Sequence, residues 1–190
     1  MKKTDQRTRL TRMLIRQSLT ALLHQKPIQS ISIRELCELA GINRGTFYAH
    51  YEDIYDLLNQ IEAEMLEDFQ KALAPLLEQS GDAVTPLQIT AGIFECTREN
   101  ADLCSVILGP NGDKNFATQL LDIGRKRCVA CYSKFFPNAT AQKIDYFYTF
   151  VSAGCIGLLE KWLNEGMTLS STELAQIAEG IMLSGIQFLN

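Results

Sequence analysis

One segment of this chain, Ser32 to Tyr51 with the sequence SIRELCELAGINRGTFYAHY, constrains the fold more than any other part. It predicts two short helices joined by a tight turn. Ser32 can cap the first helix by accepting a hydrogen bond from a backbone N–H. The apolar residues of that helix recur at helical spacing, and they are Ile33, Leu36, Cys37 and Ala40. Gly41 supplies the left-handed residue that ends a helix, and Asn43 can cap a second helix over residues 44–50.

The second helix has one apolar side and one polar side. Phe47 and Tyr51 are expected to point inward. The residues left to face outward are Arg44, Gly45, Thr46, Tyr48 and His50. A cation, small residues, a phenol and an imidazole make a poor core but suit a DNA groove, where arginine reads guanine edges and hydroxyls meet phosphates. The segment therefore predicts a DNA-recognition helix.

Charge is distributed unevenly along the 190 residues. The net charge of −4 by itself argues against a nucleic-acid partner. Residues 1–51, however, contain nine Lys and Arg against three Asp and Glu, a balance of +6, whereas residues 52–190 have a balance of −10. A basic head on an acidic body is typical of a phosphate-binding module joined to a regulatory domain. We therefore expect a DNA-binding domain over 1–51 and a second domain over 52–190.

Helical patterns cover most of the chain, and no alternating β pattern interrupts them. About nine helices are expected, over residues 4–25, 33–40, 44–50, 52–75, 86–100, 103–108, 114–136, 140–166 and 171–189. The first is expected to bury a stripe of leucines, Leu10, Leu14, Leu19, Leu22 and Leu23. The helix from residue 52 is expected to bridge the head and the body. The predicted class is all-α.

Composition narrows the class of protein further. Apolar residues make up 46% and charged residues 21%, which is typical of soluble globular domains. There is no apolar run long enough to cross a bilayer and no apolar signal core, so a cytoplasmic location is expected. Six cysteines in such a chain are expected to be reduced thiols.

Residues 8–60 resemble the DNA-binding domain of the TetR family of transcriptional regulators. The resemblance rests on the spacing of Gly41, Gly45, Phe47, Tyr48 and Tyr51, followed by YDLL at the start of the next helix. It implies DNA contacts by Arg34, Asn43, Arg44, Gly45, Thr46, Tyr48 and His50, with Arg44 at a base, Arg34, Asn43, Tyr48 and His50 at phosphates, and Gly45 allowing close approach. One position departs from the family pattern, because a phosphate-directed lysine is replaced by Ile54 after two acidic residues. We expect the basic N-terminal arm to compensate.

The resemblance also implies partners. They are a near-palindromic double-stranded DNA operator, a small-molecule effector and a second copy of the chain, with repression as the family default. Small residues such as Ala153 and Gly157 favour a homodimer interface on the helices at about 140–165 and 171–189. Aromatic candidates for lining an effector pocket are Phe69, Phe94, Phe116, Tyr132, Tyr146 and Phe150, beside Phe135 and Trp162. The acidic body favours a neutral or cationic effector.

The sequence also permits other interpretations. Cys128 and Cys131 lie beside three cations, which permits a redox role, although two thiols at this spacing are more often core. We expect no metal site, no cofactor and no catalytic residues, because the chain lacks the common enzymatic motifs. The alternatives are a helical small-molecule-binding protein without specific DNA recognition and, more remotely, a helical enzyme.

Overall fold

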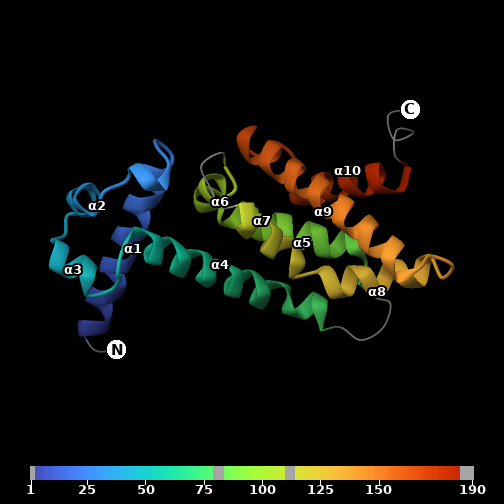
Figure 1. Ribbon diagram of the computed structural model, residues 1–190, viewed down its shortest axis with the longest axis horizontal. Helices are drawn as coiled ribbons and strands as arrows, with labels where there is room; N and C mark the ends of the chain where they lie inside the picture. Colours follow the sequence, from blue (N-terminus) through green and yellow to red (C-terminus); the bar gives the residue numbers. More distant parts are fainter. Residues whose placement is uncertain (1–2, 79–83, 110–113, 185–190) are drawn as a thin grey trace. The chain divides into compact units, whose positions relative to one another are not determined.

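The computed structural model describes residues 3–78, 84–109 and 114–184, and those residues form helices and connecting turns without any strand (Figure 1). The α-helices are α1 (Lys3–Leu23), α2 (Ile33–Ala40), α3 (Arg44–Tyr48), α4 (Ile54–Leu77), α5 (Pro86–Glu99), α6 (Ala101–Ile107), α7 (Lys114–Asp122), α8 (Arg125–Phe135), α9 (Ala141–Asn164) and α10 (Ser171–Ser184), with a 3-10 turn η1 (Ile28–Ser30) after α1. The predicted all-α class is confirmed.

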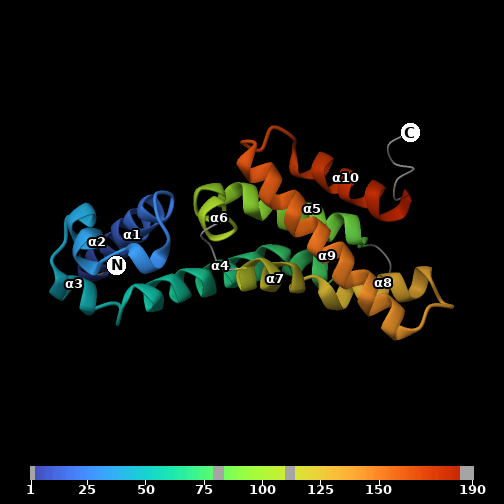
Figure 2. The ribbon, with the colours of Figure 1, turned by 45° about the horizontal axis from the view of Figure 1, so that its top comes forward.

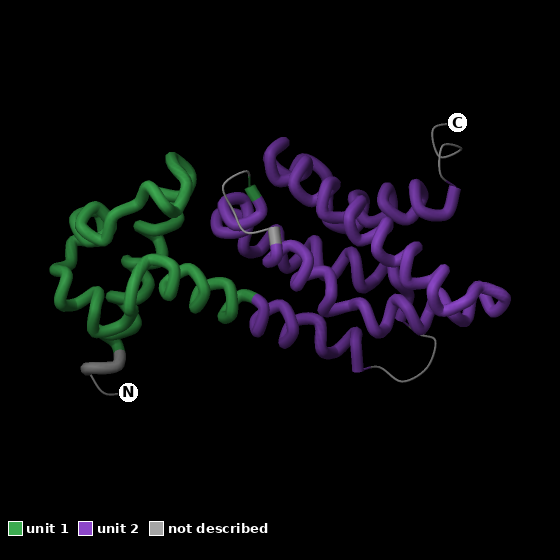
Figure 3. Tube along the Cα trace, in the orientation of Figure 1, with its two compact units in different colours: residues 1–65, 109–112 green, residues 66–108, 113–190 purple. Residues whose placement is uncertain are grey.

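The chain forms two compact units, which are coloured separately in Figure 3. The first, here called the head, contains α1 to α3 and α4 as far as Met65. The second, here called the body, contains α4 from Leu66 onward and α5 to α10. The division therefore falls inside α4, whereas the sequence places the boundary before it, between residues 51 and 52. No helix among the described residues is long and apolar enough to span a membrane.

The core of the head lies where α2 packs against α1 and α3 packs against α2. Ile15 and Leu19 of α1 are almost fully buried there, together with Leu36 and Phe47. Leu10 is 53% exposed, so the predicted leucine stripe is wrong at that position. The reason is that the early turns of α1 border an open groove, and Ile15 instead begins the buried face.

The body packs α10 against α5, and α9 against α7, α8 and α10 (Figure 2). Caps predicted from sequence are present. Thr85 and Gln88 form a reciprocal capping box at the start of α5. Ser170 and Glu173 do the same at α10, where the Ser170 N–H donates to the Glu173 carboxylate and the Glu173 N–H to the Ser170 hydroxyl. These local bonds set where each helix begins.

The predicted single helix over 114–136 is wrong, because α7 ends at Asp122 and α8 begins at Arg125. Gly124, which lies between them, packs against Ile89 of α5. A Cβ atom at Gly124 would lie 2.6 Å from Cγ2 of Ile89, so the close approach needs glycine. Helix α4 also continues through Pro75 to Leu77. Residues 110–113, most of the stretch between the expected helices at 103–108 and 114–136, lie outside the described residues, as does the predicted end of the last helix at 185–189.

Candidate nucleic-acid interface

The turn between α2 and α3 has the local chemistry that the sequence predicts. The Ser32 hydroxyl accepts a hydrogen bond from the Glu35 N–H over 3.2 Å and caps α2. Gly41 ends the helix with a φ of 65°, in the left-handed region. The N–H of Ile42 then donates to the carbonyl of Cys37 over 3.0 Å, which closes the turn. These bonds fix the direction in which the chain enters α3.

Helix α3 is only five residues long, so its stability depends on its caps and its packing. The Oδ1 atom of Asn43 accepts from the Thr46 N–H over 2.8 Å and from the Thr46 hydroxyl over 3.1 Å. Phe47 is fully buried, and its ring lies 5.6 Å from the ring of Tyr51, which is itself buried. The expected inward pair, Phe47 and Tyr51, is confirmed.

The opposite side of α3 faces away from this core. Arg44 and Gly45 are exposed, Tyr48 is 57% exposed, and Thr46 and His50 are half-buried. Arg44 makes no ion pair within the described part of the chain, so its guanidinium is available to a ligand. An exposed arginine and phenol on a short helix, anchored from behind by a buried ring, can enter a groove and meet base edges and phosphates.

Two other predicted DNA contacts have internal partners. Arg34 lies on the exposed face of α2 and pairs with Glu38 over 2.7 Å, which raises the pKa of the guanidinium. Exposed pairs of this kind contribute little to stability, so a phosphate can replace the carboxylate at small cost. Asn43 uses its Oδ1 for the cap, and its amide NH₂ group remains as a donor.

The structure explains the departure from the family pattern at the start of α4. Ile54 is 6% exposed, so its side chain belongs to the core of the head. The acidic residues around it serve the helix start. Asp53 accepts from the N–H of Asp56 over 2.8 Å, and Asp56 accepts from the N–H of Glu52 over 2.9 Å. Hydrogen bonds from the Gln60 amide and the Glu52 N–H lower the pKa of Asp56.

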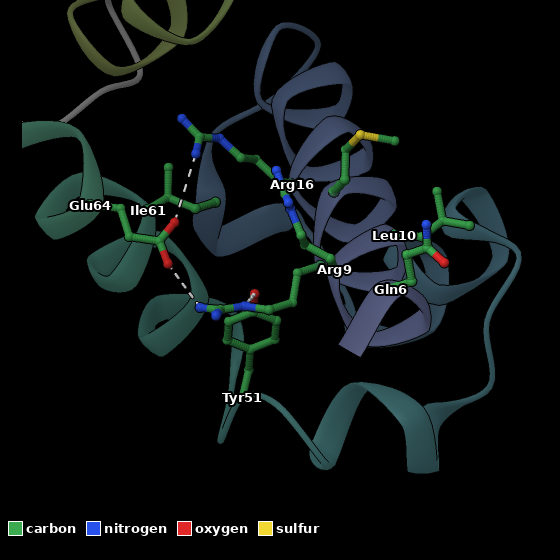
Figure 4. Close-up of a pocket in the computed structure, with 9 residues that line it drawn as sticks. Gln6, Arg9, Leu10, Arg16, Tyr51, Ile61 and Glu64 are labelled. Atoms are coloured by element: carbon green, nitrogen blue, oxygen red, sulfur yellow. Dashed lines mark hydrogen bonds and ion pairs between the residues drawn. The ribbon is translucent and has the colours of Figure 1, made fainter. Parts of the chain in front are cut away.

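A groove that sequence patterns did not predict lies between α1 and α4 of the head (Figure 4). Its volume is about 570 Å³. The lining residues are Gln6, Arg9, Leu10, Arg12, Met13 and Arg16 of α1, Ile61 and Glu64 of α4, and Tyr51. Arg12 contacts Tyr51 and Glu64, which are 39 and 52 residues away in sequence. No local pattern could have found this arrangement.

The six aromatic effector candidates lie in different surroundings. Phe69, Phe94 and Phe116 are buried in the core, whereas Tyr146 and Phe150 are on the surface, 69% and 76% exposed. Tyr132 borders two small, partly open cavities of about 30 and 20 Å³ between α5, α8, α9 and α10. Each cavity has room for about one water molecule. The structure therefore does not bring the six residues together around one pocket.

Cysteines surround Tyr132. Cys128 and Cys155 are buried, and burial raises their thiol pKa values to about 12 and about 11. Cys131 is half-buried, and its thiol lies 3.6 Å from the carbonyl oxygen of Val84. Raised pKa values keep Cys128 and Cys155 protonated, so neither is poised as a nucleophile. Among the described residues, no group of three or more His, Cys, Asp or Glu side chains could hold a metal ion.

Comparison with known proteins assigns both parts of the chain. Residues 15–61 match the model of "Bacterial regulatory proteins, tetR family", and residues 85–184 match that of "Transcriptional regulator C-terminal region". A 59-residue stretch is 36% identical to an uncharacterized HTH-type transcriptional regulator, YxbF, of Bacillus subtilis. That match covers 31% of this chain and only 16% of the length of YxbF.

Solved structures share the fold at low sequence identity. The fatty acid degradation regulator FadR from Bacillus halodurans is 10% identical with a TM-score of 0.66, over 93% of this chain and 96% of that one. A TetR transcriptional regulator from Streptococcus agalactiae is 19% identical with a TM-score of 0.63, over 94% and 97% of the two chains. Because α3 is capped and exposed in the head and the family models match both units, the chain belongs to the TetR family of DNA-binding transcriptional regulators.

Proposed function

We propose that this protein is a homodimeric, effector-responsive repressor that reads a near-palindromic operator through α3. The exposed face of α3 carries the proposal, because Arg44 has no ion pair among the described residues and Tyr48 stands clear of the core. In this reading Arg44 contacts a base edge. Arg34, Asn43, Thr46, Tyr48 and His50 contact phosphates or sugars, and Gly45 allows the backbone close to the duplex.

The dimer is proposed from an exposed stripe on α9. Tyr146 and Phe150 are large and exposed, and Ala153, Gly154 and Gly157 continue the same helical face. A Cβ atom on Gly154 or Gly157 would meet no other atom within 4 Å. Neighbouring α10 adds exposed Ile181 and Leu183. An apolar face with small residues at its centre supports close helix packing against a second copy, which a two-fold operator requires.

The effector is proposed to act in the body around Tyr132. The cavities there hold about one water each, so any larger molecule must separate α8 or α9 from α5. Phe69, Phe94 and Phe116 would then line an enlarged pocket only if the core around them opens. Binding that favours one arrangement of the body over another shifts the equilibrium by the differential affinity alone. DNA and effector should therefore oppose each other reciprocally.

The experiment begins with operator sequences selected from random duplex DNA by the purified protein. Arg44→Ala should weaken binding to the selected operator by about 1–3 kcal/mol, whereas Tyr48→Phe should weaken operator and scrambled duplex alike. Affinity should fall steeply with salt through counterion release. Failure to select any sequence, with salt-independent binding, would favour a small-molecule-binding protein without DNA recognition. Transcription in vitro from a promoter carrying the operator decides whether binding represses.

A further inference from the structure

A hydrogen-bonded network joins α1, α4 and the end of the recognition segment within the head (Figure 4). Nε of Arg12 donates to the hydroxyl of Tyr51 over 3.4 Å, and Nη2 of Arg12 donates to Oε1 of Glu64 over 2.8 Å. The other carboxylate oxygen of Glu64 lies 3.8 Å from Nη1 of Arg16, one turn further along α1. One carboxylate on α4 thus holds two guanidinium groups of α1.

Tyr51 links this network to the recognition helix. It follows α3 by three residues, its side chain is only 5% exposed, and its ring packs against Phe47. Phe47 is the fully buried residue of α3. Since a five-residue helix contains few hydrogen bonds of its own, its orientation depends on the packing of this aromatic pair as well as on the turn before α3. The hydrogen bond from Arg12 holds the Tyr51 ring in place against Phe47.

Glu64 connects the same network to the rest of the chain. It lies in the last turn of α4 that belongs to the head, two residues before Leu66, where the body begins. The hydrogen bond to Tyr51 is the largest cause of the raised pKa of Arg12, whose guanidinium is charged in any case and can donate to both partners at once. Any displacement of this turn of α4 along α1 must therefore break the Glu64 bond or move Arg12 away from Tyr51.

We propose that Arg12 and Glu64 are positioning residues for DNA recognition: through Tyr51 and Phe47 they set the angle of α3. Neither needs to touch DNA. The proposal rests on DNA recognition through α3 and not on a dimer or an effector. The pair is about half exposed, with side-chain exposures of 44% and 48%, so its effect on global stability is small. Its effect should instead appear as lost discrimination between operator and other DNA.

An effect of charge alone would change the affinity for DNA in the opposite direction. Glu64→Gln makes the basic head more positive, so a purely electrostatic effect would tighten binding to every duplex and leave the preference for operator unchanged. A positioning role instead lowers the operator affinity relative to that for scrambled DNA. Tyr51→Phe removes only the hydroxyl and changes no charge, so it isolates the Arg12 bond. Comparing these two substitutions separates the effect of positioning α3 from the effect of the net charge of the head.

The test measures fluorescence anisotropy on the selected operator and on a scrambled duplex, with wild type, Tyr51→Phe, Glu64→Gln and the double variant. The ratio of the two affinities should fall roughly two- to fivefold in each single variant, the size expected for an exposed charged pair. In the double variant this affinity ratio should fall no further than in the single variant with the larger effect, because both substitutions break the same network. Melting temperatures should stay close to that of wild type.

Glu67→Gln is the matched control. Glu67 lies one turn beyond Glu64 on α4 and pairs with Lys71 over 3.0 Å, so the substitution makes the same charge change without touching Arg12. It should leave the ratio unchanged. If Tyr51→Phe does not fold, Arg12→Lys replaces it, since lysine keeps the charge but cannot bridge two acceptors as the planar guanidinium does.

The proposal is overturned if Glu64→Gln tightens both duplexes equally, or if the two single effects multiply in the double variant. Arg44→Ala distinguishes this outcome from failure of the recognition helix itself. Lost discrimination with Arg44→Ala but not with Glu64→Gln would show that α3 reads DNA without help from Arg12 and Glu64. If neither substitution changed the discrimination, DNA recognition would lie elsewhere in the chain.

Discussion

The Oδ1 atom of Asn43 accepts a hydrogen bond from the backbone N–H of Thr46 over 2.8 Å, and this bond starts the recognition helix. It commits the side-chain oxygen of Asn43 to the helix cap. The NH₂ group of the same amide makes no hydrogen bond within the described part of the chain. One side chain thus combines a structural acceptor with a donor that is available to a phosphate, and the two can be separated by substitution.

Asn43→Ser should retain the cap, since serine is a comparable N-cap residue, but lose the amide donor. We expect a melting temperature close to that of wild type and operator binding weaker by about 1 kcal/mol, the usual net value of one hydrogen bond. Asn43→Ala removes both functions and should also cost about 0.5–2 kcal/mol of stability. Calorimetry and anisotropy measure the two effects separately. Full operator affinity in Asn43→Ser would mean that Asn43 acts only as a cap.

Gly157→Leu tests the proposed dimer face on α9. Because a Cβ atom at Gly157 meets no atom within 4 Å, the isolated chain should accept the larger side chain without loss of helicity. Across a close helix crossing, however, leucine would force the two copies apart. Sedimentation equilibrium should show monomers or a weakened dimer, with an unchanged far-ultraviolet circular dichroism spectrum. An intact dimer of wild-type affinity would place the interface elsewhere.

Gly124→Ala tests the close packing that separates α7 from α8. The new Cβ would lie 2.6 Å from Cγ2 of Ile89, so either the Ile89 side chain or the backbone of α5 and α8 must shift. Overpacking of this kind costs about 1–3 kcal/mol, which urea unfolding can measure. Ile89→Ala provides the control background, because it removes the Cγ2 atom that the new Cβ would meet, so Gly124→Ala should cost less stability there than in the wild-type background. An equal cost in both backgrounds would contradict the packing argument.

The buried thiols predict a loss of stability at alkaline pH. Burial raises the pKa of Cys128 to about 12 and that of Cys155 to about 11. In the unfolded chain these thiols ionise near their ordinary value of about 8.5, so their contribution is complete below that pH and is lost as the pH rises toward the folded values. At pH 9.5 the loss should be about 1.4 kcal/mol per thiol.

Urea unfolding at pH 7.5 and 9.5 measures this loss. The double variant Cys128→Ala, Cys155→Ala lacks both thiols, so its free energy of unfolding should change less between the two pH values than that of wild type. The comparison uses the pH difference within each protein, so the packing lost with the thiols cancels. The same pH difference in both proteins would show that other groups dominate the alkaline transition.

Local chemistry let the sequence predict much of the fold. The caps at Ser32, Asn43, Thr85 and Ser170 each join residues three apart, so the pattern that encodes them lies in a few letters of sequence. Gly41 could likewise be placed, because few other residues adopt its φ of 65°. The inward placing of Phe47 followed from helical periodicity combined with the character of its neighbours.

Tertiary structure decided what depends on residues far apart in sequence. The need for glycine at position 124 comes from its contact with Ile89, 35 residues earlier, whereas helical periodicity alone continues the helix through this position. The exposure of Leu10, Tyr146 and Phe150 depends on which neighbouring helix covers each face, and apolar character does not determine that. The link from Arg12 to Tyr51 and Glu64 exists only because folding brings three separate segments together. The sequence alone therefore determined the all-α class, the local helix caps and which residues of α3 face outward, because these depend on neighbouring residues. Side-chain packing between helices decided which cavities, surfaces and long-range bonds the protein has.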